Sequence, residues 1–473
     1  MNFLYTFAST LLLSLLSLSS SSDISQLFET WCKEHGKTYT SQEEKSYRLK
    51  AFEDNCDFVK KHNEGNSIYT LSLNAFADLT HQEFKSSRLG LSAAPLNPDQ
   101  RNLEVTGVFG DIPASIDWRK KGAVTNVKDQ GSCGTLVYLC KYTCTAFYFV
   151  AIDFCYNTRC LSLLAWYRIA DAAGACWSFS ATGAIEAINK IATGSLVSLS
   201  EQELVDCDRS FNSGCEGGLM DYAFKFVINN HGIDTEEDYP YRAQDGTCKK
   251  EKLKRHAVTI DKYVDVPPNN EKQLLQAVAA QPVSVGICGS ERAFQMYSKG
   301  IFTGPCSTSL DHAVLIVGYG SENGVDYWIV KNSWGTSWGM SGYMHMQRNS
   351  GNSQGVCGIN MLASYPVKTS PNPPPPPPGP TRCSFFTRCG AGETCCCASK
   401  FFGICISWKC CGLDSAVCCK DRLHCCPHDY PICDADRNLC LKRAGNATRM
   451  EAIEGKTSGK LSRWDSLIEA WIQ

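Results

Sequence analysis

Fourteen cysteines lie between Cys383 and Cys440, and this density constrains the fold of the chain more than any other feature. A segment of this composition has too few apolar side chains for an ordinary hydrophobic core, so covalent bonds or metal ions must hold it together. The residues before it, 370–381, read SPNPPPPPPGPT. Such a run forms polyproline II, which serves as a stiff spacer. The sequence therefore predicts a small cysteine-rich module, residues 382–441, joined by a linker to a larger N-terminal part.

The start of the chain indicates the compartment in which these cysteines are found. Leu11–Leu18 is a leucine-rich core followed by four serines. This pattern predicts a secretory signal peptide over residues 1–22, and the apolar stretch is too short to span a membrane. Secreted chains use their cysteines for disulfides. We therefore expect a protein of the secretory pathway, found in a vacuole, a lysosome or the extracellular space, with no membrane span. The net charge of −2 gives no indication of a nucleic-acid partner.

A stripe of polar and apolar side chains follows in residues 23–110. Its members are spaced four or three residues apart, which places them on one side of a helix. They are Glu44, Arg48, Phe52, Asn55, Val59 and Asn63. A second motif, LNAFAD, contributes Asn74, Phe76 and Asp78. Spacing alone is also compatible with an ordinary amphipathic surface helix, so the identities of the residues have to decide.

Cys176 is the candidate nucleophile. It begins the run CWSFSATGAIEAI, whose apolar residues recur at helical spacing, so a helix is expected to start near it. A thiol at a helix N-terminus feels the positive end of the helix dipole, which lowers its pKa. The alternative is a buried structural cysteine.

A thiolate that attacks a carbonyl needs a base, a group that orients the base, and donors for the oxyanion. His312 precedes an apolar, strand-like run and offers an imidazole. Asn332 in KNSWG can accept a hydrogen bond from that imidazole, and Trp334 can shield the bond from water. Gln130 in DQGSCG offers a side-chain amide to the oxyanion, beside the backbone N–H of Cys176.

Together these motifs resemble the papain family of cysteine proteases. DQGSCG, CWSFS, SGCEGG, LDHAV, GYG and KNSWG occur in the order of that family. The N-terminal stripe resembles the ERFNIN helix of papain-family propeptides, with Val59 where isoleucine is usual and Ser72 where the second motif usually has glycine. The resemblance implies an α+β fold. A papain-like peptidase would occupy residues 111–369, with a helical left domain, a β-barrel-like right domain and a cleft between them, and residues 23–110 would form a helical inhibitory propeptide.

The resemblance also implies roles for individual residues. Cys176 would be the nucleophile, His312 the base, Asn332 its orienting group, and Gln130 a donor to the oxyanion. The pocket for P2, the second residue before the cut, would be apolar and would favour Leu, Val or Phe over Arg. The implied substrate-binding residues are Gly217, Gly218, Leu219, Met220, Gly286, Leu310, Ala313, Trp334 and Leu362. The implied disulfides are Cys133–Cys215, Cys207–Cys248 and Cys306–Cys357, which leaves Cys288 as a free buried thiol.

The cysteine-rich module resembles a granulin domain in its adjacent cysteine pairs and in HCCPHDYPIC. That family implies a stack of short hairpins joined by disulfides. A zinc cluster is the alternative, but the secretory context favours disulfides, and we expect neither a metal nor a cofactor. A papain-like protease, a proline-rich linker and a granulin domain in tandem resemble a plant cysteine protease. Asn446 begins a glycosylation sequon in the C-terminal tail, residues 442–473.

Residues 135–174 depart from the family pattern. In the family, GSCG is followed at once by a small residue and CW, whereas here this segment separates Gly134 from Ala175. It is apolar and aromatic and adds Cys140, Cys144, Cys155 and Cys160. Either it is a functional insertion folded as a stapled hairpin or helix, or it is a gene-model or splicing accident such as a retained intron. We favour the second interpretation, because removing the segment restores GSCGACWSFS. We expect the segment to be extruded from an intact core, to separate Gln130 from Cys176, and to impair activity.

The expected function is that of a cysteine endopeptidase made as a zymogen. It would be a monomer that hydrolyses polypeptides with an apolar residue at P2 and is inhibited by its own propeptide. Protein protease inhibitors are a further candidate class of partner. The alternative function is that of a secreted, granulin-bearing binding protein whose protease domain is inactive because of residues 135–174.

Overall fold

The computed structural model describes residues 23–92, 112–133, 174–373 and, with short gaps, 380–460. The chain forms two compact units, Met1–Pro374 and Pro375–Gln473, and each is described by itself. The expected signal peptide, nearly all of the interruption at 135–174, the centre of the proline run and Asn446 lie outside the described residues. A membrane-crossing helix, long and apolar enough to span a bilayer, is absent from the described part of the chain.

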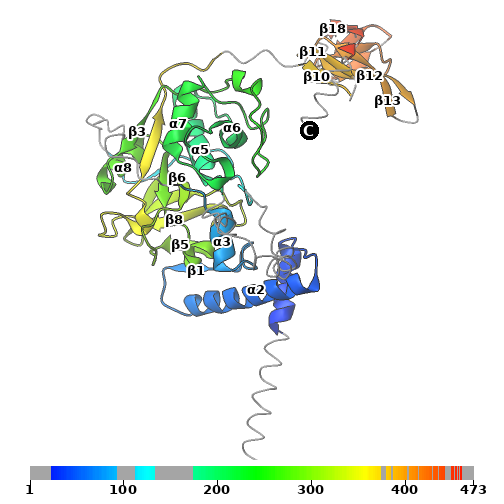
Figure 1. The fold of residues 1–473 in the computed structure, drawn as a ribbon. Helices are drawn as coiled ribbons and strands as arrows, with labels where there is room; N and C mark the ends of the chain where they lie inside the picture. The colour runs from blue at the N-terminus through cyan, green and yellow to red at the C-terminus, as the bar shows by residue number, and fades with distance from the viewer. Residues whose placement is uncertain are drawn as a thin grey trace, which may run out of the picture. The chain divides into compact units, whose positions relative to one another are not determined.

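The N-terminal part of the first unit is helical (Figure 1). After a helix over residues 23–34, α2 (Gln42–Asn63) begins where the side chain of Ser41 accepts the N–H of Glu44. The short strand β1 (Tyr69–Leu71) and the helix α3 (His81–Arg88) follow. α3 begins with a capping box between Thr80 and Glu83.

The stripe predicted for this region lies on α2 and holds the LNAFAD segment in place. Phe52 is completely buried. The side-chain amide of Asn55 donates to the carbonyl oxygens of Ala77 and Leu79 at 2.8 and 2.9 Å. Asn63 exchanges two hydrogen bonds of 2.9 Å with the backbone of Leu71. The polar members of the stripe thus satisfy backbone groups of a segment with little secondary structure of its own, which explains why this helix is not simply amphipathic.

A nine-stranded sheet forms the centre of the first unit, and the N-terminal region takes part in it. β1 pairs with β5 (Tyr297–Phe302), so the N-terminal region extends the sheet at one edge. All neighbouring strands are antiparallel except β5 and β8, and β2 (Ile116–Asp117) pairs with β6 beside the main path. After β1 and β5 the order is β8 (Tyr343–Gln347), β7 (Val325–Lys331), β6 (His312–Glu322), β4 (Val283–Ile287), β9 (Ala363–Val367) and β3 (Lys262–Val266).

Three helices build the second core of this unit. α5 (Cys176–Thr193), α6 (Glu201–Cys207) and α7 (Met220–Asn229) gather at one side of β6 (Figure 1). Their apolar side chains form one buried cluster, whereas the strands β3–β8 share another with the N-terminal region, α8 (Glu271–Ala280) and α9 (Arg292–Gln295). The predicted α+β fold, with a helical and a β-rich part, is confirmed. Disulfides join Cys133 to Cys215, Cys207 to Cys248, and Cys306 to Cys357.

The second unit is a set of four small three-stranded sheets held by disulfides. The strands are β10 (Pro380–Arg382), β11 (Thr387–Ala391), β12 (Thr394–Phe401), β13 (Ile404–Cys411), β14 (Val417–Cys418), β15 (His424–Cys426), β16 (Ile432–Asp434), β17 (Leu439–Leu441), β18 (Arg449–Glu451), β19 (Ile453–Glu454), β20 (Lys456–Thr457) and β21 (Gly459–Lys460). The pairs are Cys383–Cys395, Cys389–Cys410, Cys396–Cys418, Cys397–Cys405, Cys411–Cys425, Cys419–Cys433 and Cys426–Cys440. Disulfides therefore take the place of an apolar core here, as the cysteine density predicts.

Candidate active site

Cys176 is the first residue of α5 and is completely buried. No side chain caps this helix end within the described residues. The Sγ atom of Cys176 accepts the backbone N–H of Ala313 at 3.3 Å. Burial raises the pKa of the Cys176 thiol to about 12, and the N–H groups of Ala313, Gly90 and Trp177 oppose that rise. The thiol is therefore protonated in this form of the protein, contrary to the lowered pKa expected from the helix end alone.

His312 and Asn332 lie at the same end of two paired strands. His312 begins β6, Asn332 directly follows β7, and the antiparallel register brings them together. The imidazole Nε2 lies 2.8 Å from the side-chain oxygen of Asn332. The indole of Trp334 stacks on the imidazole, with ring centroids 4.6 Å apart. Burial lowers the pKa of His312 to about 4, against the raising effect of the Asn332 hydrogen bond, so the imidazole is neutral.

The two pKa shifts share one cause, which has a chemical consequence. Burial favours the neutral thiol of Cys176 and the neutral imidazole of His312 alike. An arrangement that exposes both groups to solvent would favour the thiolate and the imidazolium together. Burial therefore favours the neutral forms of both side chains as they lie in this structure.

Gln130 is fully buried and its amide is held at both ends. The oxygen accepts the hydroxyl of Ser333 at 2.6 Å, and the nitrogen donates to the backbone oxygen of Arg88 at 2.9 Å. The indole N–H of Trp334 donates to the same oxygen at 3.3 Å. The amide proton therefore points at a carbonyl group, as an oxyanion donor must, and the carbonyl belongs to the end of α3.

The segment that begins at the last residue of α3, residues 88–92, covers the site. Gly218 donates its N–H to the oxygen of Gly90 at 3.0 Å and accepts the N–H of Ser92 at 3.1 Å. Gly90 also packs against the chain just before Cys176, because a Cβ added to Gly90 would lie 2.0 Å from the oxygen of Gly174. The propeptide therefore uses the backbone edge at Gly218 that was predicted to bind extended peptide.

The side chain of Leu91 enters the pocket predicted for P2. It is 4% exposed and belongs to the same apolar cluster as Leu219, Met220 and Ala313. A Cβ added to Gly286 would lie 2.9 Å from Leu91 and 3.0 Å from Leu362. The predicted pocket residues are thus brought together around a leucine. Sequence reasoning missed residues 88–92, and the only available signal was a glycine between two leucines after the last propeptide helix.

The two ends of the interruption meet at one residue. Cys133 is disulfide-bonded to Cys215, and the N–H of Gly174 donates to the oxygen of Cys215 at 2.7 Å. The expectation that residues 135–174 separate Gln130 from Cys176 is therefore wrong for the described residues. A Cβ on Gly174 would lie only 3.0 Å from the amide nitrogen of Gln130, because anchoring at Cys215 fixes both sides of the gap. The expected extrusion of the segment concerns residues that lie outside those described.

Models of three known families match the chain. The papain family cysteine protease matches residues 112–145 and 166–367, the cathepsin propeptide inhibitor domain (I29) residues 28–84, and granulin residues 394–441. A probable cysteine protease, RD21B of Arabidopsis thaliana, is 46% identical over 451 residues, which cover 92% of this chain and 88% of that protein. The chain belongs to the papain family of cysteine proteases. The family match leaves residues 146–165 unmatched, inside the interruption.

Other relatives of this papain-family protease agree with that assignment. A low-temperature-induced cysteine proteinase of Solanum lycopersicum is 48% identical, with 76% of this chain and 93% of that protein covered. The structure of a recombinant stem bromelain precursor is 36% identical, with a TM-score of 0.60, and covers 74% of this chain and all of that one. The proform of Amb a 11, a ragweed pollen cysteine protease, is 36% identical with a TM-score of 0.61 and covers 75% of this chain and 97% of that one. This papain-family protease is a cysteine endopeptidase zymogen with an I29 propeptide as its own inhibitor, and a granulin domain follows its peptidase. An inactive binding protein is not favoured by these findings.

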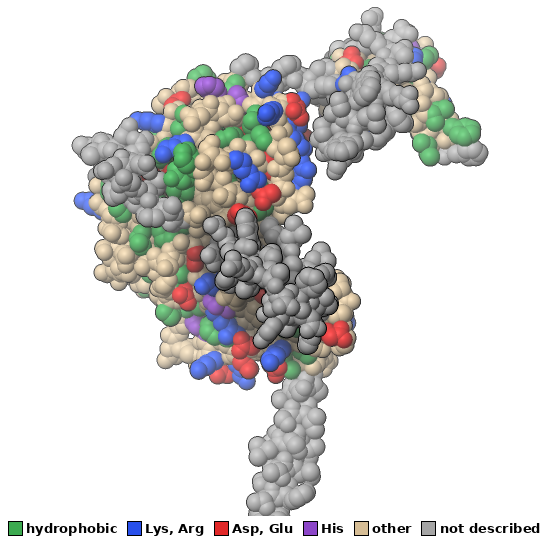
Figure 2. Space-filling model, in the orientation of Figure 1, with side chains coloured by type: hydrophobic (Ala, Val, Ile, Leu, Met, Phe, Trp, Pro, Cys, Tyr) green, Lys and Arg blue, Asp and Glu red, His purple; other side chains and the backbone are tan. Residues whose placement is uncertain are grey.

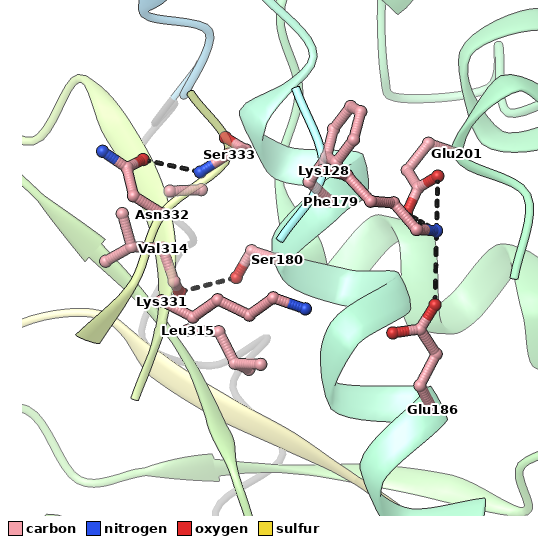
Figure 3. Close-up of a pocket in the computed structure, with 11 residues that line it drawn as sticks. Lys128, Phe179, Ser180, Glu186, Glu201, Val314, Leu315, Lys331, Asn332 and Ser333 are labelled. Carbon is pink, nitrogen blue, oxygen red and sulfur yellow. Dashed lines mark hydrogen bonds and ion pairs between the residues drawn. The ribbon is translucent and has the colours of Figure 1, made fainter. Parts of the chain in front are cut away.

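A cluster of charged side chains lines a pocket of this protease (Figure 3). The amine of Lys128 lies 2.7 Å from Glu201 and 3.3 Å from Glu186. The amine of Lys331, one residue before Asn332, donates to the backbone and hydroxyl oxygens of Thr125 at 2.9 and 3.0 Å. The cluster thus connects α5 and α6 with β7, the strand before Asn332. The Lys128 amine is paired with carboxylates, whereas the Lys331 amine is satisfied by the neutral oxygens of Thr125.

The acidic residues of α6 give the fold a pH dependence. Burial raises the pKa of Glu203 from an ordinary 4.5 to about 8, against the N–H of Asp234. Between these two values the folded state binds more protons than the unfolded state, so stability falls as the pH rises. We expect Glu203 to lower the free energy of unfolding by roughly 1–3 kcal/mol between pH 5 and pH 7.5, read from urea denaturation as the difference between the unchanged proenzyme and Glu203→Gln. Glu203→Gln should flatten this dependence, whereas Glu237→Gln, at an exposed carboxylate nearby, should not. Equal slopes for Glu203→Gln and the unchanged protein would contradict the assignment.

Proposed function

We propose that Cys176 is the nucleophile of this peptidase, His312 its general base, Asn332 the group that orients the base, and Gln130 a donor to the oxyanion. The observation that carries the proposal is the hydrogen bond from Ala313 to the Sγ of Cys176, one residue after the His312 that is bonded to Asn332. A nucleophile, a base and an orienting group therefore adjoin one another in the expected order.

The proposed reaction begins when the propeptide leaves the cleft. His312 takes the proton of Cys176, and the thiolate attacks the scissile carbonyl carbon. The amide of Gln130 and the backbone N–H of Cys176 stabilise the oxyanion. The imidazolium then protonates the leaving amine, and water hydrolyses the acyl-enzyme with His312 again acting as base. The hydrogen bond from Gln130 to the Arg88 carbonyl supports this role, since a substrate carbonyl could accept the same donor.

A peptide with an electrophilic warhead tests the assignment directly. A leucine-bearing epoxide should label one cysteine of the activated protein, and mass spectrometry should find the label on Cys176. The proenzyme should react slowly, because Cys176 is completely buried there. Labelling of another cysteine, or none after removal of the propeptide, would overturn the proposal.

We propose an apolar P2 preference, because Leu91 of the propeptide lies among the residues of the pocket. Leu362→Glu should shift the preference towards arginine. Its carboxylate would pair with a guanidinium, and it would make the pocket less favourable for an apolar side chain than leucine does now. The ratio of kcat/KM for Arg and Leu dipeptide substrates should rise about 10-fold or more. Leu362→Met, which keeps the pocket apolar, is the control. An unchanged ratio in Leu362→Glu would contradict the assignment of Leu362 to the P2 pocket.

We also propose roles for the segments outside the peptidase and a destination for the protein. Residues 1–22 are a signal peptide, residues 370–381 a linker, and Asn446 a glycosylation site. The protein acts as a monomer in a vacuole or the extracellular space, and protein inhibitors can occupy its cleft. The signal-like N-terminus and the ten disulfides of the described residues support an oxidising destination.

A further inference from the structure

The hairpin of β12 and β13 in the granulin unit carries an exposed apolar end. Phe401 and Ile404 face each other across its turn, and Ile406 follows two residues later. Their exposed fractions are 63%, 71% and 64%, and that of Ile404 exceeds every other large apolar side chain in the described residues. In Figure 2, green side chains gather at this outer end. Such a concentration of exposed apolar surface is typical of an interaction site.

Disulfides keep this end from collapsing into the module. Cys397–Cys405 joins the two strands close to the turn, and Cys396–Cys418 and Cys389–Cys410 fasten the inner end of the hairpin. The apolar side chains are therefore presented on a covalently fixed scaffold. A partner that buries them has little conformational entropy to remove.

The charges of the hairpin indicate the kind of partner. Thr394–Cys411 contains Lys400 and Lys409 and no Asp or Glu, and neither lysine forms an ion pair within the described residues. A second copy of the hairpin would bring like charges together. An anionic bilayer instead accepts apolar side chains at its acyl boundary and ammonium groups among its headgroups.

We propose that the β12–β13 hairpin is a membrane-docking element that binds anionic lipid surfaces. Phe401, Ile404 and Ile406 enter the interface, and Lys400 and Lys409 contact the headgroups. Docking would hold the protease near a membrane without a membrane-spanning segment.

Vesicle co-sedimentation of the full chain tests this. Vesicles of phosphatidylcholine with about 30 mol % phosphatidylserine should bind the protein, and pure phosphatidylcholine should bind it more weakly. The double variant Ile404→Ser/Ile406→Ser should weaken binding by about 10-fold or more. Leu423→Ser is the matched control, because Leu423 is a 48% exposed apolar residue of the same unit outside the hairpin; its binding should be unchanged.

A second variant separates misfolding from loss of docking. Lys400→Gln/Lys409→Gln leaves the apolar end intact and should weaken binding to the phosphatidylserine vesicles alone. Disulfide content by mass spectrometry should be the same in all variants. The proposal is overturned if the unchanged protein binds no vesicles, or if the isoleucine variant binds as well as Leu423→Ser. It is also overturned if the protein binds no vesicles but self-associates in sedimentation, and the hairpin variants abolish that self-association. The apolar end of the hairpin would then be an interface between copies of the chain.

Discussion

Replacing Cys176 with serine is expected to lower kcat/KM by roughly 10⁴-fold or more, because a hydroxyl is a far weaker nucleophile than a thiolate in a site built around sulfur. His312→Ala should have a comparable effect, since it removes the proposed base, whose chain neighbour Ala313 donates its N–H to the Cys176 sulfur. Asn332→Ala should cost less, because Trp334 still packs on the imidazole. The measurement is hydrolysis of a P2-leucine substrate after the propeptide has been removed in trans by a second protease.

The chain supplies a matched control for this experiment. Cys288 is also a free, completely buried cysteine, and its sulfur lies 3.5 Å and 3.2 Å from the hydroxyl oxygens of Ser290 and Ser307. Cys288→Ser keeps a hydrogen-bonding group in a polar surrounding and should leave kcat/KM within about 2-fold. Substantial activity in Cys176→Ser, or a loss in Cys288→Ser as large as that in Cys176→Ser, would contradict the assignment of the nucleophile.

The propeptide is expected to lose most of its inhibitory strength when Gly90 becomes alanine. The added Cβ would lie 2.0 Å from the oxygen of Gly174, which is backbone and cannot swing aside. Either Gly90 or the chain that precedes the nucleophile must shift, and the hydrogen bond between Gly218 and Gly90 would be strained. The inhibition constant of a separate propeptide, residues 23–110, should therefore rise roughly 100-fold against the mature enzyme.

Ser92→Ala is the control for this prediction. Ser92 is exposed and uses its backbone N–H towards Gly218, so loss of its hydroxyl leaves that contact intact. The inhibition constant of this variant should stay within about 2-fold of the unchanged propeptide. If Gly90→Ala inhibited as well as Ser92→Ala, the segment after α3 could not lie this close to Cys176 in solution.

The fold and the family were predictable because several local signals agreed. The stripe on α2 was recognisable from residue identity rather than from amphipathicity, since Asn55 and Asn63 serve backbone groups instead of solvent. Cys176, His312 and Asn332 lie far apart in sequence but fall at the ends of regular elements, where short motifs constrain them. The seven disulfides of the granulin unit were expected as a class, but their connectivity was not, because spacing alone permits many pairings.

What the sequence could not predict depends on long-range burial. A helix N-terminus lowers the pKa of a thiol, yet the pKa of Cys176 is raised, because the residue is completely buried and the N–H groups around it, that of Gly90 included, only oppose the rise. The path of residues 88–92 has no periodic pattern and is set by contacts with Gly218 and Asp311, more than a hundred residues away. The closeness of Gln130 to Gly174 was also not predictable, since sequence distance says nothing about where the two ends of the interruption are fastened.

The two ends of the interruption at residues 135–174 indicate where a foreign segment can be inserted into a papain-fold protease. Cys133 and Gly174 are both fastened to Cys215, one through a disulfide and one through a hydrogen bond. The distance between Gln130 and Cys176 therefore does not depend on the length of chain between Cys133 and Gly174. Since loop closure costs little more for a long loop than for a short one, this junction is a permissive position for grafting. An epitope, an affinity tag or a foreign loop inserted between Gly134 and Ala175 would begin and end beside Cys215. The positions of the residues that line the cleft would then not have to change.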